Sequence, residues 1–117
     1  MKYMLLFYAD EAAWMVLSEE ERNAAIEQIG RWYGAQVESG RLVEGRRLAG
    51  ESSVKTVDLG PAGRSRTPIV MDGSFVETKE ALGSYAIVEV TGPEEAVGVA
   101  ESWPGGGLVE IRPVLEE

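Results

Sequence analysis

One short run near the start of the chain limits the possible folds more than any other feature. Lys2 to Tyr8 is almost continuously apolar and rich in aromatic residues. In a strand, successive side chains point to opposite faces, so this run would present two apolar faces. The residues of the first face are Tyr3, Leu5 and Phe7, and those of the second face are Met4, Leu6 and Tyr8. The run therefore predicts a central strand that is covered on both sides.

Two amphipathic helices are predicted to supply one of these covers. Ser18 and Glu21 match a capping box, and a helix follows over about residues 19–39. Its apolar stripe consists of Ile26, Ile29, Tyr33 and Val37, with Ala25 and Trp32 at the edges of the stripe. Pro93 opens a second helix, which runs to about Ser102. The residues that this second helix is expected to bury are Ala96, Val97 and Ala100.

The remaining strand-like segments complete the order of elements. They are residues 41–48, 54–57, 67–70, 84–90 and 108–114. The second and third of these flank a Gly-Pro-Ala-Gly turn and form a small inserted hairpin. Without it the order is strand, helix, strand, strand, helix, strand, which predicts an α+β fold of the ferredoxin-like βαββαβ type. With both helices on one face, the other face still needs a cover. We therefore expect a homodimer with facing sheets.

Length and composition exclude several classes of protein. At 117 residues the chain is expected to form a single domain over residues 1–117. Eleven basic and twenty acidic residues give a net charge of −9, which disfavours nucleic-acid binding. Cysteine and histidine are absent from the sequence, so we expect neither a metal nor a cofactor site built on them. The opening apolar run stops at Asp10, too short for a signal peptide or membrane span, which predicts a cytoplasmic protein without membrane contact.

The run from Met71 to Glu80 contains most of the candidate catalytic groups. Asp72 begins a turn-like Asp-Gly pair, and Phe75 is an aromatic residue in an otherwise polar loop. Without histidine, acid–base chemistry falls to carboxylates, with Lys79 available to stabilise a developing anion. The candidate catalytic residues are Asp72, Glu77 and Asp10. In the alternative interpretation these groups are structural: they cap a turn, form local ion pairs and anchor the loop.

A pocket between the sheet and its loops is the second candidate feature. The candidate ligand-contacting residues are Tyr8, Trp14, Phe75, Lys79 and Tyr85. An aromatic pocket with one acid suits a small-molecule ligand, whereas the alternative is core and interface packing. Arg46 and Arg47 either bind a carboxylate or phosphate or lie on a solvated or dimer-rim surface.

From Asp72 to Gly83 the sequence resembles the YCII-related superfamily, in particular its DGPF branch, whose hallmark reads DGPFAETKE. The corresponding run here reads DGSFVETKE, so Ser74 and Val76 depart from the hallmark. The resemblance extends to the opening MKYMLL, to the SYAI that follows the hallmark and to VEIRP near the end. It implies a ferredoxin-like α+β fold and a dimeric α/β-barrel-type assembly.

The resemblance leaves two classes of function open. In some members of the superfamily a His–Asp pair is proposed as catalytic, but this chain has no histidine to supply it. The first hypothesis is a dimeric binding protein or acid–base enzyme with a small-molecule pocket at the junction of sheet and loops. The second is a non-catalytic interaction or regulatory module associated with a sigma factor, because some DGPF-type members occur beside or fused to extracytoplasmic-function sigma factors.

Overall fold

The computed structural model describes residues 1–63, 66–75 and 79–116. The elements in chain order are β1 (Lys2–Asp10), α1 (Glu11–Met15), α2 (Glu19–Glu38), β2 (Leu42–Arg47), the 3-10 turn η1 (Glu51–Ser53), β3 (Lys55–Asp58), β4 (Ile69–Asp72), β5 (Glu80–Glu89), α3 (Pro93–Glu101) and β6 (Leu108–Pro113). The long elements follow the predicted βαββαβ order, and β3 and β4 are inserted between β2 and β5. No helix in the described part of the chain is both long and apolar enough to cross a membrane.

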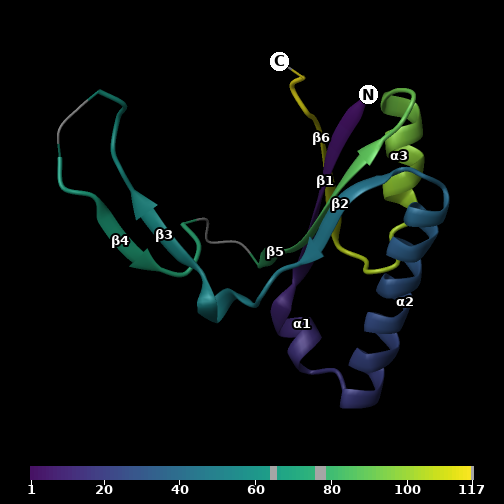
Figure 1. Cartoon of the computed structure of the whole chain (residues 1–117). Coiled ribbons are helices and arrows are strands. Elements are labelled where there is room, and N and C mark those ends of the chain that lie inside the picture. Colours follow the sequence, from purple (N-terminus) through teal and green to yellow (C-terminus); the bar gives the residue numbers. More distant parts are fainter. Residues whose placement is uncertain (64–65, 76–78, 117) are drawn as a thin grey trace.

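The main sheet has four antiparallel strands in the order β2-β5-β1-β6. This order confirms the predicted α+β, ferredoxin-like fold, and β1 is a central strand as its two apolar faces indicate. Helices α2 and α3 lie along one face of the sheet (Figure 1). The other face carries no helix in the described part of the chain, and we call it the open face.

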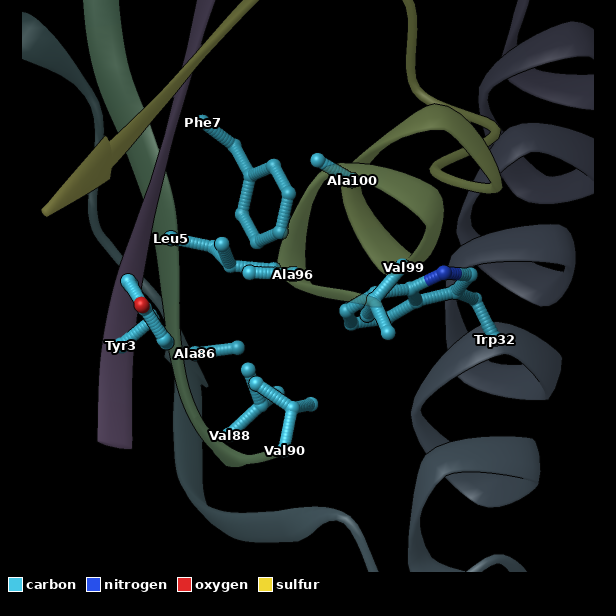
Figure 2. Close-up of a cluster of buried hydrophobic side chains, with 10 residues drawn as sticks. All are labelled: Tyr3, Leu5, Phe7, Trp32, Ala86, Val88, Val90, Ala96, Val99 and Ala100. Atoms are coloured by element: carbon cyan, nitrogen blue, oxygen red, sulfur yellow. The ribbon is translucent and has the colours of Figure 1, made fainter. Parts of the chain in front are cut away.

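The core lies between the helices and the covered face of the sheet. It consists of Tyr3, Leu5 and Phe7 from β1, Ala86 and Val88 from β5, Val90 just after it, Trp32 from α2, and Ala96, Val99 and Ala100 from α3 (Figure 2). Two predicted contacts are wrong: Val37 is 62% exposed and Val97 is 45% exposed. The helices are rotated so that Trp32, Gln36 and Val99 face inward instead.

Aromatic packing explains this rotation of α2. The ring of Trp32 meets that of Phe7 edge to face at 5.5 Å and that of Trp103 at 5.1 Å. Phe7 and Trp103 stack at 3.8 Å. The indole Nε1 of Trp32 also donates a hydrogen bond to Ser102 Oγ at 2.8 Å. A large ring with a satisfied polar atom buries more surface than Val37 would, so it occupies the centre of the interface.

The predicted capping box of α2 is present, and a substitution in it measures what the cap contributes to stability. Ser18 Oγ accepts a hydrogen bond from the Glu21 N–H at 3.1 Å, and Glu21 Oε1 accepts one from the Ser18 N–H at 2.9 Å. We expect Ser18→Ala to lower the free energy of unfolding by about 1 kcal/mol, because an amide at the helix start loses its acceptor. Urea denaturation measures the difference, and an unchanged midpoint would contradict the expectation.

The same cap makes part of this stability depend on pH. The Ser18 backbone N–H lowers the pKa of Glu21, and the Ser18 side chain adds to the effect. A group whose pKa is lowered on folding stabilises the folded state above its unfolded-state pKa. This contribution is lost as the pH falls through the folded-state pKa. The contribution of Glu21 is therefore present at neutral pH and disappears in acid.

Strands β3 and β4 form a separate two-stranded sheet. We call residues 54–75 the arm, of which 54–63 and 66–75 are described. The arm closes on itself at its base, where the Gly73 N–H donates to the Val54 carbonyl at 2.8 Å. It projects from the side of the main sheet opposite α2 and α3 (Figure 1). Asp72 ends β4 and Glu80 begins β5, so the loop between them is shorter than the sequence indicated.

Candidate functional site

Two hollows lie on opposite faces of the main sheet. The first, which we call the helix-side pocket, has a volume of about 450 Å³. It is bounded by the end of β1, α1, α2, the end of β2 and the loop after α3. Its apolar walls include Phe7, Trp14, Met15, Ile29, Leu48 and Trp103.

The second, which we call the open-face hollow, has a volume of about 650 Å³. It lies where the arm joins the open face, and its lining includes Tyr8, Ser74, Phe75, Leu82, Leu108 and Glu110. Phe75 is 77% exposed, so this hollow is only loosely walled in a single chain. The helix-side pocket is more enclosed than the open-face hollow, because several separate elements of the fold form its walls.

Three carboxylates line the helix-side pocket, and each accepts a hydrogen bond from a backbone amide. Asp10 Oδ1 caps α1 by accepting from the Ala13 N–H at 3.2 Å. Both oxygens of Glu11 accept from the Glu51 N–H, at 3.1 and 3.0 Å. Glu51 Oε1 in turn accepts from the Ser74 N–H at 3.1 Å. The last two carboxylates therefore fix η1 and the base of the arm.

Asp10 differs from the other two because its second oxygen faces a cation. Its Oδ2 lies 3.8 Å from the Nζ of Lys79, whose side chain is 80% exposed. The Asp10 side chain is itself 25% exposed. Asp10 is thus a partly buried carboxylate at the pocket wall, with one oxygen held by the helix start and the other near a solvated ammonium group.

Arg47 is the one cation among the described residues that line the helix-side pocket. Neighbouring side chains on a strand point to opposite faces. Arg46 lies opposite Tyr85 on the open face, and Arg47 lies opposite the buried Ser84 on the covered face. Within residues 1–63, 66–75 and 79–116, Arg47 has no carboxylate partner. The pocket therefore combines aromatic walls and three carboxylates with a guanidinium group that forms no ion pair with a described carboxylate.

Two tyrosines on the open face donate hydrogen bonds to carboxylates. Tyr8 Oη donates to Glu110 Oε1 at 3.4 Å, and Tyr85 Oη donates to Glu44 Oε1 at 3.1 Å. Burial raises the pKa of Tyr8, and the charge of Glu110 raises it further. A hydrogen bond from Arg112 lowers the pKa of Glu110. Both phenols are thus held protonated, as donors rather than as bases.

The structure does not bring the sequence-predicted residues together at one site. Asp10 and Trp14 line the helix-side pocket, whereas Tyr8 and Phe75 line the open-face hollow. Lys79 lies near Asp10, and Tyr85 lies on the open face. Asp72 pairs with Lys55 on the arm and is 86% exposed. Glu77 lies outside the described residues.

Sequence reasoning missed the pairing of Arg47 with Trp103 in one pocket. The sequence did indicate the position of one of these two residues, the arginine. Two consecutive arginines in a strand must lie on opposite faces, so one of them had to point toward the helices. The position of Trp103 depends on the loop after α3, for which the sequence offers no spacing rule. In the described part of the chain, no three acidic side chains converge as a metal site would require.

Comparisons with known proteins agree with the fold. The family model described as YCII-related domain matches residues 1–117. A protein of Rhizobium meliloti (strain 1021), described as uncharacterised, is 31% identical over 118 residues. That alignment covers 97% of this chain and 92% of the relative. The similarity therefore extends over both hollows and the arm rather than over one motif.

Proposed function

Because the chain belongs to the YCII-related family, we propose that it is a small-molecule-binding protein whose ligand occupies the helix-side pocket. The observation that supports this best is Arg47, a guanidinium group that lines an aromatic pocket and has no carboxylate partner among the described residues. Arg47 is exposed, so an anionic group can reach its guanidinium group from solvent. The volume of about 450 Å³ falls within the range of small-molecule sites.

The chemistry of the pocket favours a flat, apolar ligand with a single carboxylate. Trp14 and Trp103 offer ring surface for an aromatic or alicyclic body, beside the core residue Phe7. Arg47 presents the planar fork that pairs with a carboxylate through two hydrogen bonds. The acidic groups of the lining and the net charge of −9 disfavour ligands with several negative charges, such as nucleotides.

We propose Asp10 as the acid–base group if the ligand is also converted. Of the three predicted carboxylates, Asp10 lines this pocket. One of its oxygens is committed to α1, which fixes the orientation of the other. Asp72 lies on the exposed arm, and its ion pair with Lys55 supports the structural interpretation of that residue.

A matched pair of arginine variants tests the proposed ligand site. We expect Arg47→Gln to weaken binding of an aromatic carboxylate about 10- to 100-fold, because a hydrogen bond to a charged group contributes roughly 1.5–3 kcal/mol. Arg46→Gln, which changes the neighbouring residue on the opposite face, should bind as the wild type does. Tryptophan fluorescence reports binding directly, since Trp14 and Trp103 line the pocket.

The probes are benzoate, phenylacetate and indole-3-acetate, each compared with its uncharged amide. Equal weakening by both arginine variants, or equal affinity for acid and amide, would contradict the role of Arg47. The alternative function, a non-catalytic interaction module, predicts no saturable binding of any of these compounds. The same titration therefore separates the two classes of function.

We also propose that the protein is a homodimer that buries the open face of its sheet. The middle of that face is apolar, with Met4 and Leu6 on β1 beside Ile87 on β5. Its edges carry charges of both signs: Glu44 and Arg46 on β2, and Glu110 and Arg112 on β6. An apolar centre with a mixed charged rim is typical of an interface between two copies of one chain.

A further inference from the structure

The arm exposes more apolar surface than a free hairpin can carry. Val57 and Val70 face each other across the two strands on the same side of the arm. They are 51% and 66% exposed, and Leu59 beyond them is 65% exposed. Ile69 on the other side is 49% exposed. A two-stranded hairpin is at best marginally stable in water, so an arm with apolar side chains on both sides needs a cover.

The charged groups in the described part of the arm form ion pairs within the arm itself. Lys55 forms an ion pair with Asp72, and Arg66 forms one with Asp58. The backbone N–H of Gly60 also donates to Asp58 and is the first cause of the lowered pKa of that carboxyl group. These four described side chains therefore pair with one another, and beside them the arm presents exposed apolar side chains to an occupant.

The accessible surface area and the radius of gyration of the chain indicate how much of its surface a partner would cover. A compact monomer of 12.7 kDa exposes roughly 6,200 Å², whereas this chain exposes 8282 Å². Its radius of gyration is 16.5 Å, compared with about 13 Å for a compact domain of this length. The excess of roughly 2,000 Å² per chain matches the area that an obligate homodimer buries, about 2,000–5,000 Å² over both partners.

We propose that a second copy of this chain occupies the concave space between the arm and the open face, and that each copy clasps the other with its arm. The inference rests on the proposed homodimer and adds the arm to its interface. The arm projects from the same side of the sheet as the open face (Figure 1), so one partner can cover both surfaces. In a two-fold dimer each copy covers the arm and the open face of the other, because both copies carry both surfaces.

The connection at the base of the arm supports this role. The Ser74 N–H is held by Glu51, whose own N–H is held by Glu11 at the start of α1. Thr56 Oγ1 donates to the Gly73 carbonyl at 2.7 Å and ties the first strand of the arm to its exit. These contacts fix the arm at its base and leave its apolar outer part for the partner.

A double variant of the arm tests the proposal. Val57→Thr with Val70→Thr keeps the shape and strand preference of both side chains but replaces a methyl group by a hydroxyl group at each site. We expect the dimer dissociation constant from sedimentation equilibrium to rise on the order of a hundredfold, because the change occurs twice per copy in a buried contact. The matched control is Val16→Thr with Val37→Thr, two valines exposed by 84% and 62% on the helical side of the molecule, which should leave the constant unchanged.

A second measurement uses the absence of cysteine from the chain. In Val70→Cys the introduced thiol is unique, and we expect maleimide to modify it at least tenfold more slowly above the dimer dissociation constant than below it. A Val70→Cys dimer in which this thiol reacts equally fast in both states overturns the clasp but leaves a dimer through the open face. A protein that is monomeric at all concentrations overturns both proposals. A dimer that both double variants weaken equally also overturns the clasp.

Discussion

Trp32→Ala is expected to lower the free energy of unfolding by about 3–5 kcal/mol, the range for removing a large aromatic side chain from a core. Trp32 is 6% exposed and meets the rings of Phe7, Tyr33 and Trp103 edge to face at 5.1–5.5 Å. Domains of this size are stable by only about 5–15 kcal/mol. The variant should therefore unfold at a much lower urea concentration or fail to fold at ordinary temperature.

Two further variants separate the packing of Trp32 from its hydrogen bond. Trp32→Phe keeps an aromatic ring but removes the indole N–H, and Ser102→Ala removes the acceptor of that N–H. We expect Ser102→Ala to cost about 1–3 kcal/mol, since it leaves a buried donor without its partner. If Trp32→Ala cost no more than Ser102→Ala, the ring packing would contribute little and our account of the core would be wrong.

Gly107→Ala is expected to lower the free energy of unfolding by about 2–5 kcal/mol. Gly107 has φ +76°, and a Cβ at this position would lie 2.0 Å from the carbonyl oxygen of Tyr8. The left-handed conformation costs roughly 1–2 kcal/mol for a residue with a side chain, and the overlap adds about 1–3 kcal/mol. The clash falls where β6 begins its pairing with β1, so it would separate Leu108 from Tyr8.

Gly106→Ala is the control for this prediction. Gly106 has a similar φ of +68°, but a Cβ there meets no atom within 4 Å. Gly106→Ala should lower the free energy of unfolding only by the cost of the left-handed conformation, roughly 1–2 kcal/mol. Thermal or urea denaturation of both variants measures the difference, which isolates the close approach to Tyr8. Equal stabilities would show that the loop before β6 moves freely enough to avoid the clash.

Local patterns in the sequence were sufficient for the fold. The two apolar faces of the first strand predicted its central position, and Ser18 with Glu21 predicted where α2 begins. The rotation of α2 was not predictable in this way. Val37 fits the apolar period, but Trp32 fills the core because it also reaches the rings of β1 and of the loop after α3. Such contacts join residues far apart in the sequence, and periodicity does not record them.

The candidate site was less predictable than the fold. Tyr8 and Asp10 are close in sequence, yet they line hollows on different faces of the sheet. Asp10 is the N-cap of α1, so its side chain follows the start of that helix instead of the alternation of β1. The sequence places the two residues on one face of a strand but does not show where the strand gives way to this helix. The direction of the arm is likewise set by its base contacts with Glu51 and Glu11 rather than by its own residues.

The central position of β1 has a consequence for how the protein is made. β1 is synthesised before the other strands of its sheet, but it pairs with β5 and β6, which are synthesised after all the other described strands: Lys2 pairs with Glu89 and Tyr3 with Pro113. At about 5–20 residues per second, the most apolar strand waits several seconds for its partners. During that time α2 can form alone, whereas the nascent first strand remains open to chaperones. The sheet therefore assembles only after β6 has been synthesised, and high sequence separation between its partners makes that step slow.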